Sequence, residues 1–470
     1  MLHICITIKG VSRPFIYSQI ISEFFIVRFW VSLKKVIPHG ATFFLCFNIS
    51  VLPSQSKIKY KKVKNFSLKN LGPGLLYAGA AVGVSHLVQS TRAGANYGLW
   101  MVVIVLATNA IKYPFFEFAS RYTAVKRKSI LEAYKEMGNW ALWMFLILTI
   151  STMFVIQAAI VTVTSGLAKE IFGLEIPIPV ISTSLLVIVG VILIIGKYSL
   201  LDKLMKVIII LLAITSLVAA FLALEQNWGR TNQFVFEMDL SQSAHLFFLI
   251  ALIGWMPAPM DITVWQSAWT RERQKIDKGF NLKNALFDFK IGYWGTAILA
   301  ALFVTLGSAT LFNSGIELAS GGGAFANQLL GIYTKSIGSW AYPIIAIAAF
   351  TTMLSTNLSV MDAYPRVLGD TVKLLNLSKN EIKYYLWIIL VIAGTIVVVF
   401  FFMKNMRQMV DLATTLSFLT APIIGYLNLK TVTAIDFPEE HKPTKFMYSV
   451  AWFGLIAMVV LSMIFLYTKF

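Results

Sequence analysis

Residues 72–86 read GPGLLYAGAAVGVSH, and residues 254–261 read GWMPAPMD. Both are apolar stretches crowded with Gly and Pro, which a continuous membrane helix avoids because each costs backbone hydrogen bonds that lipid cannot replace. Polar residues stand at both interruptions, Ser85 and His86 in the first and Asp261 in the second. Unwound backbone frees carbonyls and half-helix ends that hold a substrate midway across a bilayer, so the pattern favours a transporter over two proline kinks without a ligand.

The composition is typical of an integral membrane protein. Of the 470 residues, 57% are hydrophobic and only 13% are charged, whereas about 25% are charged in soluble domains. The net charge of +18 does not indicate a nucleic-acid partner, because Lys and Arg cluster between the apolar segments. The two cysteines, Cys5 and Cys46, precede the first expected span, so the membrane core has no disulfide framework and no paired-Cys metal motif. The expected partner is the lipid bilayer.

Apolar stretches of about 20 residues predict eleven transmembrane helices. They fall at 72–92, 99–119, 141–168, 178–197, 202–224, 243–269, 287–313, 338–366, 383–403, 407–430 and 446–468. Basic residues concentrate before the first span and after the second, fourth, sixth and eighth. These alternate loops lie on one side, so we expect a multi-pass protein of the plasma membrane with a cytoplasmic N-terminus.

The two interruptions fall in spans one and six. That spacing predicts an all-α fold with an inverted repeat of five helices plus five: repeat one at about 70–224, repeat two at about 243–430, and an added helix at 446–468. In such folds the broken helices of the two repeats face each other around the substrate, so we expect breaks near Gly83–His86 and Trp255–Pro259 that face each other. Residues 1–68 precede this transporter domain, 69–470, as a leader that is either weakly structured or the product of a wrongly assigned start.

From about residue 70 to 470 the chain resembles the Nramp family of divalent metal ion transporters. The resemblance rests on Gly72-Pro73-Gly74, Ala93-Gly94-Ala95-Asn96-Tyr97-Gly98-Leu99, Ala119-Ser120-Arg121-Tyr122, Leu131-Glu132-Ala133 and the Gly254 to Pro259 interruption. It implies the APC-type (LeuT-like) fold with broken helices 1 and 6.

The site motifs of that family are missing here. Where the family carries Asp-Pro-Gly-Asn in span one, this chain has Gly83-Val84-Ser85-His86, and where it carries Met-Pro-His in span six, this chain has Ala258-Pro259-Met260. The acidic residues that the family uses along span three are absent from 141–167. The resemblance therefore implies a divergent member with a remodelled site.

The polar and sulfur-containing residues at the two interruptions are the candidates for substrate binding. The expected substrate-binding residues are Gly83, Ser85, His86, Gln89, Trp255, Met256, Ala258, Met260 and Asp261. An imidazole, a carboxylate and a thioether suit a divalent ion of the Mn, Fe or Mg class, with His86, Asp261 and Met260 as ligands, although one carboxylate suits Mg only if that ion stays largely hydrated. Each has a structural alternative: His86 bonding a carbonyl of a broken helix, Asp261 capping a half-helix, and Met256 and Met260 packing.

Glu117 is the candidate for proton coupling, since it is a carboxylate within span two. Its alternative is a salt bridge to Arg121, one turn away. Because span three lacks titratable groups, we expect transport to depend little on a proton gradient.

No pattern typical of an enzyme occurs. The sequence has no Gly-rich phosphate loop with a Lys, no nucleophile elbow and no His-x-x-x-His, and no cofactor is expected. The leading hypothesis is a monomeric secondary transporter of divalent metal cations. The alternatives are a transporter of a small organic or neutral solute, favoured by Trp255 and Trp265, and a sensor or scaffold that no longer transports.

Overall fold

The structure is a computed structural model that describes residues 71–195, 198–231, 238–316, 318–319, 322–378, 382–401 and 406–469. These residues belong to one compact unit, Asn65–Phe470. The expected leader, 1–68, lies outside the described residues. Throughout the described part the regular elements are helices, which confirms the all-α fold class.

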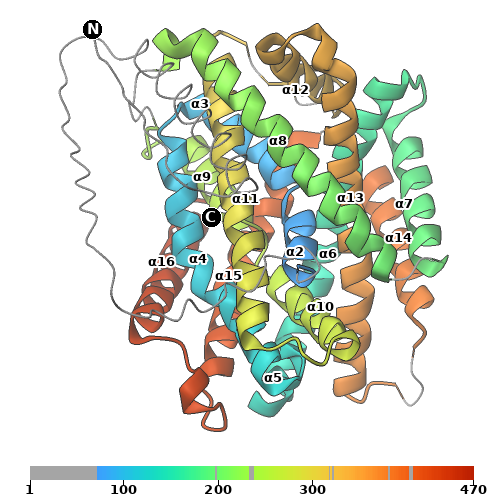
Figure 1. Ribbon diagram of the computed structural model, residues 1–470, viewed down its shortest axis with the longest axis vertical. Coiled ribbons are helices and arrows are strands. Elements are labelled where there is room, and N and C mark those ends of the chain that lie inside the picture. The colour runs from blue at the N-terminus through green and yellow to red at the C-terminus, as the bar shows by residue number, and fades with distance from the viewer. Residues whose placement is uncertain are drawn as a thin grey trace, which may run out of the picture. The chain divides into compact units, whose positions relative to one another are not determined.

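The helices follow the expected order along the chain (Figure 1). They are α2 (Pro73–Ala81), η2 (Ser85–Ser90), α3 (Thr91–Tyr97), α4 (Met101–Lys126), α5 (Ile130–Met137), α6 (Asn139–Phe172), α7 (Ile178–Ile195), α8 (Tyr198–Thr231), α9 (Ser243–Trp255), α10 (Ile262–Ile276), α11 (Leu282–Leu311), α12 (Gly322–Ile337), η3 (Ser339–Ala341), α13 (Tyr342–Leu374), α14 (Tyr384–Phe401), α15 (Met406–Thr433), η4 (Glu439–His441) and α16 (Lys445–Lys469).

Eight of the described helices are long and apolar enough to cross a membrane: α4, α6, α7, α11, α13, α14, α15 and α16. The other three expected spans coincide with α8 and with two interrupted pairs, α2 with α3 and α9 with α10. Each expected span thus falls on a described helix or helix pair, and the total of eleven stays a prediction.

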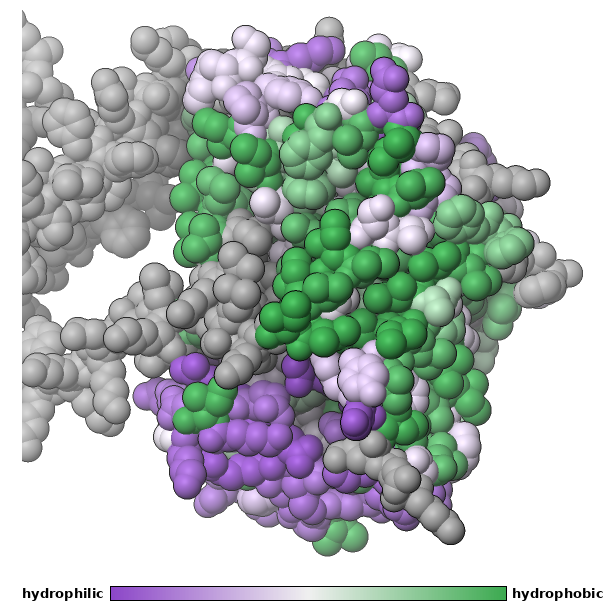
Figure 2. All heavy atoms as spheres, turned by 90° about the vertical axis from the view of Figure 1, so that its right-hand side faces the viewer, coloured by the Kyte–Doolittle hydropathy of each residue, from purple (hydrophilic) through white to green (hydrophobic). Residues whose placement is uncertain are grey.

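The outer helices expose many apolar side chains, and exposing so many of them to water would be unfavourable. Figure 2 shows a broad apolar band on one face of the molecule, with polar residues above and below it. Exposed apolar residues include Ile188, Val191 and Ile195 of α7, Ile389 and Phe400 of α14, and Phe453 and Met463 of α16. Such a contiguous surface is covered by lipid in a membrane protein.

The first interruption follows directly from the sequence. Pro73 stands at the first turn of α2, where its missing N–H costs nothing. The helix ends at Ala81, and the chain resumes at Ser85 as the wide helical turn η2, which continues into α3. The break is therefore Val82–Val84, slightly earlier than the expected Gly83–His86, because Ser85 and His86 already belong to η2.

The second interruption separates α9 from α10. Helix α9 ends at Trp255, and α10 begins at Ile262. The six residues between them include Pro257 and Pro259, which cannot donate backbone hydrogen bonds to a helix. The expected break in span six is thus present.

Helix α11 packs along both halves of the first broken helix with backbone touching backbone. A Cβ at Gly292 would lie against the carbonyl of Gly74, and one at Gly307 against the carbonyl of Thr91, both closer than real Cβ atoms approach. Small residues allow membrane helices to approach this closely. Asp288 adds a polar tie, since its carboxylate accepts the N–H groups of Gly72 at 3.0 Å and Gly74 at 2.6 Å at the start of α2. Asp288 of α11 therefore caps the start of α2.

Candidate substrate site

The two interruptions line one small cavity. Its wall is formed by Ala80, Ala81, Val84, Ser85, Ile156, Ile160, Trp255, Pro259, Ile262, Trp265, Thr356 and Val360. The cavity measures about 20 Å³, which is room for a single water molecule. The expectation that the two breaks face each other is therefore confirmed, and α6 and α13 complete the wall.

Thr356 on α13 offers its single hydroxyl proton to the backbone that the first break leaves without helical partners. Its Oγ1 lies 3.0 Å from the Gly79 carbonyl oxygen and 3.1 Å from that of Val82. An unsatisfied carbonyl at membrane depth costs several kcal/mol. Thr356 thus holds the break open and lines the cavity at the same time.

His86 turns away from the cavity toward α11. Its Nε2 lies 3.0 Å from the carbonyl oxygen of Thr296, and its Nδ1 lies 2.7 Å from the Ser85 hydroxyl. The Ser85 hydroxyl in turn lies 2.7 Å from the Ala81 carbonyl oxygen. Both ring nitrogens are engaged. The carbonyl that His86 contacts belongs to the continuous helix α11, whereas the structural alternative named a carbonyl of a broken helix.

Asp261 stands immediately before α10, at the helix end whose dipole favours negative charge. Its Oδ2 accepts from the Tyr364 hydroxyl of α13 at 3.5 Å. His86 contacts α11 and Asp261 contacts α13, and neither residue lines the small cavity. In the described ranges, no group of three or more His, Cys, Asp or Glu residues is placed to hold a metal ion.

The remaining candidates divide between the cavity wall and the core. Trp255 lines the cavity and donates its indole N–H to Ser417 at 2.8 Å. Met256, Ala258 and Met260 are buried in apolar clusters, where packing explains them. Gly83 borders Thr356, because a Cβ there would lie 2.7 Å from its Oγ1. Of the nine candidates, Ser85 and Trp255 line the cavity.

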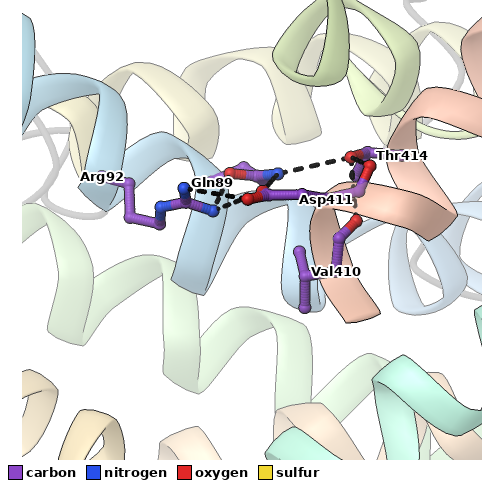
Figure 3. Close-up of polar contacts among 5 residues, drawn as sticks. All are labelled: Gln89, Arg92, Val410, Asp411 and Thr414. Atoms are coloured by element: carbon purple, nitrogen blue, oxygen red, sulfur yellow. Dashed lines mark hydrogen bonds and ion pairs between the residues drawn. The ribbon is translucent and has the colours of Figure 1, made fainter. Parts of the chain in front are cut away.

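Gln89 belongs to a polar cluster with Arg92, Asp411 and Thr414 (Figure 3). Arg92 forms an ion pair with Asp411 of α15 at 2.7 Å and donates to the Gln89 side-chain oxygen at 3.0 Å. The Gln89 amide lies 3.4 Å from Asp411 Oδ1 and 3.5 Å from Thr414 Oγ1. Arg92 and Asp411 also line a second cavity of about 610 Å³ between α3, α9 and α15. The cluster therefore joins α3 to α15 beside this larger space.

Glu117 forms the salt bridge that was its structural alternative. Its Oε1 pairs with Arg121 at 2.7 Å, and Arg121 also donates to the His441 carbonyl at 2.7 Å. The other oxygen, Oε2, is buried without a partner among the described residues. The pair fixes the end of α4 to the segment before α16.

A neutral polar ladder connects α6 to α13. The Gln157 amide donates to the Asn357 side-chain oxygen at 2.7 Å, and the Asn357 amide donates to the Thr164 hydroxyl at 2.9 Å. The sequence did not assign Thr356 to the break. Asp411 and Lys112 were missed entirely, although each is a charged residue inside an apolar helix, which is the signal that would have found them.

Residues 74–468 match the model of the family described as natural resistance-associated macrophage protein-like, Nramp. The chain belongs to the Nramp family. An uncharacterized protein of Pasteurella multocida (strain Pm70) is 33% identical to this Nramp chain over 396 residues, covering 83% of it and 90% of that protein.

Solved structures share the fold of this Nramp chain. The Eremococcus coleocola manganese transporter superposes with a TM-score of 0.65 at 14% identity, covering 84% of this chain and 85% of that one. The structure of MhsT in complex with L-phenylalanine gives a TM-score of 0.57 at 14% identity, covering 84% of this chain and 98% of that one. At such identities the likeness establishes the LeuT-type fold, in agreement with the predicted architecture.

Proposed function

We propose that this Nramp-family chain is a secondary membrane transporter that carries a divalent metal cation through the cavity between its two broken helices. The observation that carries the proposal is that both breaks, far apart in sequence, line one central cavity. Family membership and the shared fold with a manganese transporter support a metal substrate, of the Mn, Fe or Mg class. Transport rather than enzymatic chemistry fits this arrangement.

We assign the structure to a closed stage of the transport cycle. A cavity of about 20 Å³ admits no hydrated ion. Asp288 ties the start of α2 on one side, and the Arg92–Asp411 pair joins α3 to α15 on the other. To ligate a cation, His86 would leave Thr296 and Asp261 would leave Tyr364, so we propose that both turn inward as the cavity widens.

Thermal unfolding in the presence of metal tests the substrate. A cation present at 100 times its dissociation constant is expected to stabilise the protein by about 2.7 kcal/mol. The stabilisation by Mn²⁺ should disappear in Asp261→Ala and weaken in His86→Ala, because only Asp261 brings negative charge. Glu439→Ala, an exposed carboxylate near the start of α16, is the matched control. Equal shifts in all four proteins would place the site elsewhere, and no shift with Mn²⁺, Fe²⁺ or Mg²⁺ would contradict a metal substrate.

A small uncharged solute is the second candidate, because of the cavity wall itself. Its polar side chains are the hydroxyls of Ser85 and Thr356, next to the rings of Trp255 and Trp265. Such a wall suits an apolar solute with one hydrogen-bonding group better than a bare dication, which needs several oxygen ligands. Stabilisation by a small aliphatic or aromatic alcohol, with no response to metal, would favour this candidate.

Substrate uptake is expected to proceed without acidifying the vesicle interior. The α6–α13 ladder of Gln157, Asn357 and Thr164 contains no titratable group, and Glu117 is held by Arg121. Proton relays within membranes need titratable side chains. The measurement is internal pH in proteoliposomes during uptake, with Glu117→Gln as the comparison. Acidification in the wild type that Glu117→Gln abolishes would overturn the uncoupled mechanism.

We further propose that the chain acts as a monomer in the plasma membrane with its N-terminus in the cytoplasm. Helices α4 and α10 both end in basic residues, which the positive-inside rule assigns to the cytoplasmic side. The apolar band of Figure 2 is the surface that lipid would cover. No cofactor and no nucleic acid takes part in this scheme.

A further inference from the structure

Lys112 is a buried lysine in the middle of α4. The residue is buried inside the protein, with 1% of its surface exposed. Its Nζ donates to the carbonyl oxygens of Ile253 at 2.9 Å and Gly254 at 3.2 Å, in the last turn of α9. No carboxylate of the described residues forms an ion pair with it. The partner of this ammonium is therefore the end of a half-helix.

That end is a natural position for a small cation. The last four carbonyls of a helix lack helical partners, and the end carries roughly half a negative charge. In transporters with broken helices, freed carbonyls and half-helix C-terminal ends coordinate the coupling ion, Na⁺ or H⁺. The ammonium of Lys112 is a compact charge with three donors, and it occupies this place.

The end of α9 that Lys112 contacts is packed against α15. A Cβ at Gly254 would collide with the carbonyl of Thr414, so α9 ends pressed directly against α15. Burying an ammonium costs several kcal/mol unless strong partners compensate it. A methionine would fill the same volume without that cost, so the charge at Lys112, rather than its bulk, is what the α9 end requires.

We propose that the Lys112 ammonium is a built-in monovalent cation at the α9 break, which replaces a co-transported Na⁺ or K⁺. Removing the side chain leaves a cation site lined by the Ile253 and Gly254 carbonyls. That site takes a small monovalent cation such as Na⁺, K⁺ or methylammonium. The consequence for transport rests on the proposed function, whereas binding at the vacated site does not.

The test is thermal unfolding of the purified full-length protein in NaCl, KCl, methylammonium chloride or choline chloride at equal ionic strength. The wild type should not distinguish the salts. Lys112→Ala should unfold at least about 3 °C lower in choline chloride and recover half or more of that loss in one of the small cations. Lys112→Met, which fills the site without charge, should be destabilised and not rescued. Lys290→Ala, on the exposed side of α11, should behave as the wild type.

Two results would overturn the proposal. One is a Lys112→Ala protein that is equally unstable in all four salts. The other is wild-type uptake in proteoliposomes that requires Na⁺ or K⁺ over choline, a measurement that also decides the question if Lys112→Ala does not fold. Rescue of Lys112→Ala by a small cation, combined with no metal response in the wild type, would retain this inference and reject the divalent substrate.

Discussion

Gly292→Ala is expected to lower the free energy of unfolding by about 3 kcal/mol or more, at the upper end of overpacking effects. The added Cβ would meet the backbone carbonyl of Gly74, and backbone, unlike a side chain, cannot turn aside. Helix α11 would have to move away from α2, which also loosens the Asp288 cap. Thermal unfolding and the fraction of monodisperse protein after solubilisation measure the effect.

Gly295→Ala provides the matched control, because it lies one turn further along the same helix. A Cβ at Gly295 would meet nothing within 4 Å, so this substitution should be neutral or slightly stabilising. Gly307→Ala, whose Cβ would meet the Thr91 carbonyl, should resemble Gly292→Ala. Equal stability of the Gly292 and Gly295 variants would show that α11 does not touch the broken helix in this way.

Asp288→Ala is expected to cost about 3 kcal/mol, because two buried N–H groups at the start of α2 lose a charged acceptor together. The effect should be local as well as global. Hydrogen exchange should accelerate across 72–81 more than in α4 or α6, since Gly72 and Gly74 anchor that end of α2. Asp288→Asn should be intermediate, because the amide keeps one acceptor oxygen.

Asp277→Ala is the control that distinguishes loss of the α2 cap from the loss of any one carboxylate. Asp277 also accepts a backbone N–H, from Gly279 at 3.0 Å, but it does so in an exposed turn. Its removal should change stability by less than about 1 kcal/mol. Exchange at 72–81 that is no faster in Asp288→Ala than in Asp277→Ala would mean that the carboxylate is not what holds α2.

The fold could be predicted because its deciding features are local. Gly and Pro interrupt a helix wherever they stand, so GPGLLYAGAAVGVSH and GWMPAPMD located both breaks without knowledge of their surroundings. The breaks face each other because the two repeats place them at matching points. The shift from the expected Gly83–His86 to Val82–Val84 arises from η2, a wide helical turn that no composition rule signals.

The site could be predicted only in part, because its contacts join residues hundreds of positions apart. His86 is polar and next to the break, as expected, but its ring contacts the Thr296 carbonyl of α11. Thr356 caps the break from another helix, 274 residues from Val82. Asp411 reaches Arg92 across 319 positions. A single sequence marks such residues as unusual, and only the packed structure assigns their partners.

The pairing of Lys112 with carbonyls of Ile253 and Gly254 affects how this part of the protein can evolve. A carbonyl is present whatever side chain position 253 carries, so loss of the lysine cannot be offset by a second substitution at its partner. Position 112 should therefore vary alone or not at all among relatives. Methods that infer contacts from correlated changes between two positions would not detect this pairing, even where it is essential.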